Sequence, residues 1–212
     1  MPKRQSARDF IKETLMERIL SGTYQPGDRL VELQIAQELG TSQGPVREAL
    51  RDLQGLGLVD SESYRGTRVR EITEREIEDA YQVRAVLEQL AAELAAPRLK
   101  GNVGELEKEA ASFQRAAQAR DVKTYSAHDM EFHRKIFEAA DNELLTHMWT
   151  GVALESRFRL TLMHRIGEEE LENLAAAHLP IMEALRRGNS KEAGELARAL
   201  ICTFHSRKLP TS

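Results

Sequence analysis

Apolar residues recur every three or four positions along most of this chain, which is the spacing that gathers them on one face of a helix. The first such stripe runs from Asp9 to Ser21, and two shorter ones lie within Leu33–Leu58. The spacing changes to alternation at Thr67–Arg70, which is typical of a strand. From Thr73 onward the helical spacing returns and continues to the end. The pattern predicts a mainly α fold.

The segment Leu33–Leu58 predicts two short helices joined by a tight turn. Gly40 can adopt the positive φ that ends the first helix. Ser42 can cap the second helix, and Pro45 is tolerated in its first turn because no intrahelical N–H is needed there. The second helix divides into two faces. Its apolar face holds Val46, Leu50 and Leu53, and its polar face holds Gln43, Arg47 and Arg51.

A helix with a buried apolar face and a Gln/Arg/Arg face has the chemistry of a DNA recognition helix. Arginine presents a fork to guanine or phosphate, and glutamine can do the same for adenine. Similar pairs of helices also occur in proteins that do not bind DNA. The segment that follows favours DNA binding, because the run from Val59 to Arg70 predicts a β-hairpin. The tip of this hairpin, with Arg65, Gly66 and Arg68, can touch the DNA backbone or minor groove.

These residues resemble the winged helix-turn-helix of the GntR family of bacterial transcription regulators. The shared pattern, IxxGxxxPGxRLxExxIAxxLGxSxxPVREALxxLxxxGLV followed by RGxxV, has a specific PVREAL core. The resemblance implies a winged helix-turn-helix domain at residues 1–71. Gln43 departs from the family, which commonly has Arg there, so the base preference should differ. The residues assigned to DNA binding are Arg29, Ser42, Gln43, Arg47, Arg51, Arg65, Gly66 and Arg68.

A capping box at Thr73–Glu76 opens the second predicted domain, residues 72–212, whose pattern is helical throughout. Pro97 should end its first helix, and Pro180 should kink its fifth. Six amphipathic helices predict an all-α bundle. They span about Thr73–Ala96, Val103–Arg120, Asp121–Ala140, Asn142–Arg165, Glu168–Arg187 and Ser190–Lys208.

This second region resembles the FCD ligand-sensing domain of the FadR-type branch of the GntR family. Three motifs come in the expected order: RxxLE at Arg84–Glu88, DxxxH with FH at Asp129–His133, and NxxL at Asn142–Leu145. The six-helix count is similar to that of the shorter, VanR-like version. The resemblance implies an effector-binding and dimerisation domain.

Asp129 and His133 lie on the apolar stripe of the third helix, and His178 lies within the stripe of the fifth. Buried charges need partners, and these groups can be ligands of Zn, Ni, Mn or Fe. FCD domains bind a divalent metal with a matching Asp and three His. The fourth matching position is Leu200, which cannot ligate, and His205 lies about 140° further around the helix. Two interpretations stay open: a metal site completed by water or effector atoms, or hydrogen-bonded core residues around a cavity.

Three arginines are candidates for binding an acidic effector. Arg84 lies on an inward helix face, Arg159 shares a stripe with apolar residues, and Arg157 lies toward the edge of that stripe. The FCD resemblance places such arginines around a small carboxylate. Each arginine can instead pair with an internal acid such as Glu88 or Glu155.

Composition adds three limits. The formal net charge of −4 argues against indiscriminate coating of nucleic acid, although a local arginine stripe can still read a groove. The single cysteine, Cys202, excludes an internal disulfide and fits a reducing compartment. No apolar run approaches the roughly 20 residues that span a membrane. A cytoplasmic protein without a membrane partner is expected.

The sequence therefore predicts a transcriptional regulator, by family tendency a repressor, whose operator affinity is controlled by a small carboxylate. It should bind double-stranded DNA as a homodimer, because one recognition helix reads only a few base pairs. The alternative is an all-α metalloenzyme that uses Asp129, His133 and His178 as a 2-His-1-carboxylate triad. A third possibility is a DNA-binding scaffold whose bundle only dimerises.

Overall fold

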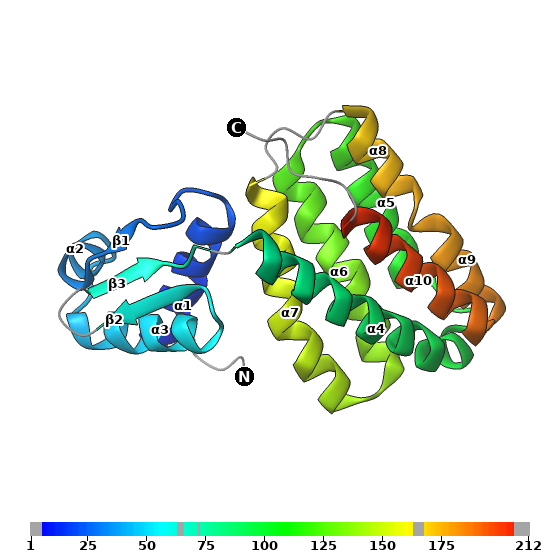
Figure 1. Ribbon diagram of the computed structural model, residues 1–212, viewed down its shortest axis with the longest axis horizontal. Coiled ribbons are helices and arrows are strands. Elements are labelled where there is room, and N and C mark those ends of the chain that lie inside the picture. The colour runs from blue at the N-terminus through cyan, green and yellow to red at the C-terminus, as the bar shows by residue number, and fades with distance from the viewer. Residues whose placement is uncertain (1–5, 63–65, 72, 163–167, 206–212) are drawn as a thin grey trace. The chain divides into compact units, whose positions relative to one another are not determined.

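The computed structural model describes residues 6–62, 66–71, 73–162 and 168–205 (Figure 1). The chain separates into two compact units, Met1–Thr73 and Glu74–Ser212. Each unit buries its own set of apolar side chains. The predicted mainly α fold with a small hairpin is confirmed, because helices dominate the described residues and the strands lie only in the first unit.

The first unit combines three helices with a three-stranded antiparallel sheet of order β1-β3-β2. The predicted hairpin is present, with Val59 paired to Val69 across its two strands. The sequence does not predict the third strand, β1, because two residues are too few to show alternation. The elements are α1 (Ala7–Leu20), β1 (Arg29–Leu30), α2 (Glu32–Glu38), α3 (Gln43–Gly55), β2 (Val59–Glu62) and β3 (Gly66–Val69).

The helix-turn-helix of this unit is α2, a turn, and α3. Gly40 takes a φ of +63° in the turn, a conformation that a Cβ would disfavour. Helix α3 packs against both α1 and α2. Its buried residues are Val46, Ala49, Leu50 and Leu53, and those of α1 are Ile11, Leu15, Ile19 and Leu20. The apolar stripes therefore form the core of the unit, and the polar face of α3 is left outside.

The second unit is a bundle in which α4 packs against four other helices, α6, α7, α9 and α10 (Figure 1). Helix α5 covers another side of α6 and also contacts α8. The helices are α4 (Glu74–Leu99), α5 (Gly104–Gln118), α6 (Val122–Ala140), α7 (Glu143–Leu162), α8 (Glu168–Ala176), α9 (Leu179–Arg187) and α10 (Ser190–His205).

Two prolines act differently from the prediction. Helix α4 continues through Pro97 to Leu99, so the expectation that Pro97 ends it is wrong. The missing N–H removes one bond in a last turn that is exposed and ends two residues later, so little is lost there. The predicted fifth helix is two helices, α8 and α9, because Pro180 occupies the first turn of a new helix instead of kinking one. His178 is the N-cap residue at this break.

Among the helices of the described segments, none is both long and apolar enough to cross a membrane.

Candidate DNA-binding face and ligand cavity

The polar face of α3 lies open to solvent. Ser42 at the helix start is exposed, and so are Gln43, Arg47 and Arg51, each one helical turn from the next. The apolar face of the same helix is buried, so the four-residue spacing fixes which side chains stay outside. The structure thus brings these four predicted DNA-binding residues to one exposed face.

Arg47 makes a forked ion pair with Glu32, which lies in the first turn of α2. Its Nη2 donates to Glu32 Oε2 at 2.7 Å, and its Nε donates at 3.1 Å. The bonds to Glu32 raise the pKa of Arg47. An ion pair in water contributes little to folding, but it holds a flexible side chain in one orientation. Sequence reasoning missed this partner, since Glu32 belongs to another helix.

The strand pair β1–β3 gathers three other predicted DNA-binding residues. Arg29 lies opposite Arg68 in the sheet register. Gly66 has a φ of +82°, and a Cβ there would meet the Arg29 guanidinium at 3.5 Å. Arg68 donates from Nη1 to the carbonyl oxygen of Gly27 at 2.9 Å. Arg65 lies outside the described residues. The structure therefore brings Arg29 to the hairpin, a proximity that requires β1.

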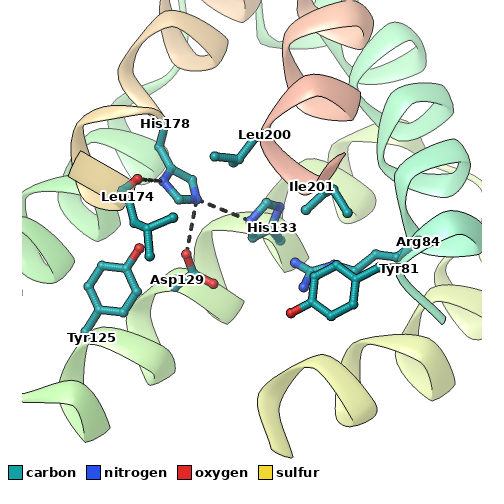
Figure 2. Close-up of a pocket in the computed structure, with 9 residues that line it drawn as sticks. All are labelled: Tyr81, Arg84, Tyr125, Asp129, His133, Leu174, His178, Leu200 and Ile201. Atoms are coloured by element: carbon teal, nitrogen blue, oxygen red, sulfur yellow. Dashed lines mark hydrogen bonds and ion pairs between the residues drawn. The ribbon is translucent and has the colours of Figure 1, made fainter. Parts of the chain in front are cut away.

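The second unit contains a small, partly open cavity between its helices, with about 30 Å³ of free space inside it (Figure 2). Polar groups meet at one part of it, and aliphatic side chains form a wall. The lining residues are Tyr81, Arg84, Tyr125, Asp129, His133, Leu174, His178, Leu200 and Ile201. Arg157 and Arg159 belong to α7, but their side chains lie outside the described part of the structure.

His178 is held at the cavity by a bond to backbone. Its Nδ1 lies 2.8 Å from the carbonyl oxygen of Leu174, which can only accept, so Nδ1 carries the proton. The other ring nitrogen, Nε2, faces Asp129 Oδ1 at 3.1 Å and His133 Nε2 at 3.3 Å (Figure 2). His178 is the residue that precedes α9, at the break between α8 and α9, and its ring is buried against the cavity.

His133 is held in a matching way by Glu88 of α4. Its Nδ1 lies 2.8 Å from Glu88 Oε2. The other carboxylate oxygen accepts from Arg84 Nε at 3.0 Å and from the indole Nε1 of Trp149 at 2.9 Å. Sequence reasoning named Glu88 as part of the RxxLE motif and as an ion-pair partner for Arg84, and this pair is present. It missed Trp149, which lies 61 residues away in the chain.

Burial and charge oppose each other at these carboxylates. Burial alone would raise the pKa of Glu88, but His133 and Arg84 outweigh it and lower the pKa to about 2. Burial likewise acts against the charge of Asp129, and the hydrogen bond and charge of His178 lower that pKa to about 2. Burial, together with the Asp129 charge, raises the pKa of Tyr125 well above its ordinary value. Both carboxylates are therefore anionic near neutral pH.

The donor set fits a divalent cation as three of its ligands. When both imidazoles are neutral with the proton on Nδ1, their Nε2 lone pairs and a carboxylate oxygen converge. Such a cluster needs a proton or a metal ion between its members. Two tetrahedral ligands about 2.1 Å from one zinc ion are about 3.4 Å apart, close to the separation of these ring nitrogens. Within the described residues, Asp129, His133 and His178 form the metal-competent group. Leu200 lies beside them and offers no donor.

Comparison with known proteins places both units in one family. The model of the bacterial regulatory proteins of the gntR family matches residues 7–69, and the FCD domain model matches residues 79–202. The chain is 34% identical to a probable D-xylose utilization operon transcriptional repressor of Paenarthrobacter nicotinovorans, over 94% of this chain and 88% of that protein. It is 29% identical to the gluconate operon transcriptional repressor of Bacillus subtilis (strain 168), over 81% and 72%.

Solved structures agree on the fold. Escherichia coli McbR/YncC superposes with a TM-score of 0.85 at 21% identity, over 95% of this chain and 96% of that one. Because the similar proteins are named transcriptional regulators and not enzymes, the metalloenzyme alternative is wrong. The FCD model alone matches more than half of the chain, and so the chain belongs to the GntR family of bacterial transcriptional regulators, with an FCD domain behind its winged helix-turn-helix.

Proposed function

We propose that this regulator is a repressor that binds double-stranded operator DNA as a homodimer and is controlled by a small carboxylate in its second unit. One chain carries both an exposed Gln/Arg/Arg helix face and a partly open cavity that holds a buried arginine beside an Asp/His/His cluster. That combination is the observation that carries the proposal. The first feature can read DNA, and the second can bind an anion.

On DNA, α3 is the element that enters the major groove. Gln43 and Arg47 lie in its first half, where recognition helices contact base edges. The Glu32 pair orients the Arg47 fork and leaves Nη1 available to a base or phosphate. Arg29, Gly66 and Arg68 form a basic edge at the hairpin, which suits contact with the backbone or minor groove. The named relatives are operon repressors, and this supports repression here.

A homodimer is supported by an apolar strip on the second unit. Helices α4 and α7 pack against each other, and both expose large apolar side chains. Val86 of α4 is 53% exposed and Leu144 of α7 is 69% exposed, which is unfavourable for a monomer in water. The strip consists of Val83, Val86 and Leu90 of α4 and Leu144 and Met148 of α7. A second copy would cover it and bring two recognition helices to two half-sites.

The effector we propose is a small carboxylate held by Arg84. This guanidinium lines the cavity while its Nε is bound to Glu88, so its other nitrogens are available to an anion. A divalent ion held by Asp129, His133 and His178 would add a fixed positive charge for the same carboxylate. The aliphatic wall of Leu174, Leu200 and Ile201 would contact the rest of the ligand.

DNA binding is tested by selection from a random-sequence duplex pool with the full-length protein. The expected product is a two-fold symmetric site whose half-sites lie about one helical turn apart or a multiple of it. Selection of no sequence above background would contradict the operator-binding proposal.

The ligand site is tested by a thermal-shift screen of small carboxylates with and without Zn²⁺, run on the wild type and on His178→Ala. A hit should raise the melting temperature of the wild type and lower its affinity for the selected operator. Elemental analysis of protein purified without chelator should find a divalent metal in the wild type and not in the variant. If the wild type binds neither metal nor carboxylate, the result favours the alternative of a DNA-binding scaffold whose helical bundle only dimerises.

A further inference from the structure

Glu88 is the one carboxylate in the described residues that touches a cavity histidine, a cavity arginine and a side chain of α7. It is 1% exposed, and its three partners are also buried. Both of its oxygens are occupied, Oε2 by His133 and Oε1 by Arg84 and Trp149. Its geometry is therefore determined from three directions at once.

We propose that Glu88 is the positioning residue of the ligand site and the link through which occupation of the cavity reaches α7. The inference rests on the proposed ligand site and goes beyond it by naming the residue that couples this site to the apolar strip of α4 and α7. Two separate consequences follow from the contacts of Glu88, one toward the cavity and one toward α7.

Toward the cavity, Glu88 determines which nitrogen His133 offers. An imidazole that donates its Nδ1 proton to a carboxylate keeps its Nε2 lone pair for the opposite side. In this structure that opposite side holds His178 Nε2 at 3.3 Å. Without Glu88, the ring could carry its proton on Nε2, where it would block a cation. The same carboxylate holds Arg84 by Nε and so orients the rest of its guanidinium.

Toward α7, Glu88 is bonded to Trp149, and this indole stacks on Phe137 with ring centroids 4.5 Å apart. Trp149 follows Met148 of the apolar strip, and Glu88 lies between Val86 and Leu90 of the same strip. A ligand that pulls His133 or Arg84 by a few tenths of an ångström must move the shared carboxylate. The indole then moves or loses its bond, and the helices that bear the strip receive the change.

Trp149 is the only tryptophan of the chain, so it gives one indole resonance and all of the indole fluorescence. The probe is Zn²⁺, which has no unpaired electrons and does not quench fluorescence. In ¹⁵N NMR at pH 8, His133 of the metal-free protein should carry its proton on Nδ1. During a Zn²⁺ titration the Trp149 indole resonance should shift, and it should stop shifting at saturation of the site.

Glu88→Gln should remove the fixed Nδ1 proton of His133, weaken Zn²⁺ binding about 10- to 100-fold and abolish the response of the indole. The control is Glu109→Gln. Glu109 of α5 lies 2.6 Å from Nδ1 of His128, a histidine on the same helix as His133 but outside the cavity lining. That variant should match the wild type in all three readouts. A side chain with only a structural role would leave the tautomer of His133 unchanged.

Glu88→Gln also leaves Arg84 buried without its countercharge. A second variant, Arg84→Met combined with Glu88→Gln, therefore removes both charges. It should show the same loss of the Nδ1-protonated tautomer of His133. The proposal is overturned if the tautomer of His133 is unchanged in both variants, or if the Trp149 indole resonance of the wild type does not shift when zinc binds. If Zn²⁺ does not bind the wild type at all, the metal part of the proposed function fails. Glu88 is then judged by the metal-free tautomer measurement alone.

Discussion

The two units keep their functional charges in opposite surroundings. In the first, Arg47 pairs with Glu32 on the surface, with side-chain exposures of 54% and 29%. In the second, Arg84 pairs with Glu88 in the core, with exposures of 4% and 1%. Both pairs join an arginine to a glutamate at about 3 Å, yet water screens only the first. Substitution of Arg47 should therefore change the stability of the fold little, whereas removing one charge of the cavity pair should destabilise the bundle.

The largest effect that follows concerns Arg84→Met. This change leaves the anionic Glu88 buried without its guanidinium, and breaking a buried pair in this way costs about 3–5 kcal/mol of the free energy of unfolding. Urea titration of the full-length protein, followed by far-UV circular dichroism so that the helices of both units are observed, measures it. The matched control is Arg47→Met, which should leave the unfolding midpoint almost unchanged. Similar midpoints for both variants would show that burial does not separate the two pairs.

For DNA binding the order of the two variants should reverse, so that Arg47→Met has the larger effect and Arg84→Met the smaller. Arg47→Met removes a fork from the recognition helix and should weaken binding to the selected operator roughly 5- to 150-fold. Fluorescence anisotropy at fixed salt gives the two dissociation constants. The control is Arg187→Met, an equally exposed arginine on α9 that pairs with Glu192.

Arg51 should behave differently from Arg47 if it contacts phosphate and not a base. Arg51→Ala then weakens binding about equally across operator sequences and lowers the slope of log K against log salt by about one. Unchanged binding in both the Arg47 and Arg51 variants would remove α3 as the recognition helix.

The difference between the units also explains what the sequence could predict. The exposed face of α3 follows from local periodicity, because Val46 and Leu50 fix which side chains face outward. Asp129 and His133 are four residues apart on one helix, so their shared stripe was equally predictable. Their convergence with His178 is confirmed as geometry, while the metal itself stays a prediction.

Contacts between distant segments were beyond the same reasoning. Glu88 meets His133 across 45 residues and Trp149 across 61, and no periodicity links these positions. Strand β1 exists only because β3 lies beside it. The break at His178 was missed because Pro180 is compatible with both a kink and a new helix start, and only packing decides between them.

A smaller effect, in the favourable direction, is expected for Leu200→His. Leu200 lines the cavity beside His133 and His178, so an imidazole there can supply a fourth nitrogen. The affinity for Zn²⁺, measured by competition with a chromophoric chelator, should rise about tenfold or more, which corresponds to about 1.4 kcal/mol. Cys202→His is the control, because Cys202 is exposed on the same helix α10. An equal rise in both variants would mean that zinc binds outside the cavity.

The smallest effect concerns Asp121, the exposed N-cap residue of α6. Asp121 caps the helix by accepting from Thr124 N at 3.0 Å, and its bonds to Thr124 lower its pKa. A pKa that is lower in the folded state means that the cap stabilises the fold above the pKa of the unfolded chain, near 3.9, and ceases to do so as the pH falls through the folded value. Asp121→Ala should therefore cost about 1 kcal/mol at pH 7 and progressively less below pH 4 in urea titrations. The control is Asp121→Asn, which keeps an accepting oxygen without the charge. It should retain most of the stability at pH 7 and lose this pH dependence. If Asp121→Ala costs the same free energy at pH 3 as at pH 7, the charge of Asp121 does not contribute to the cap.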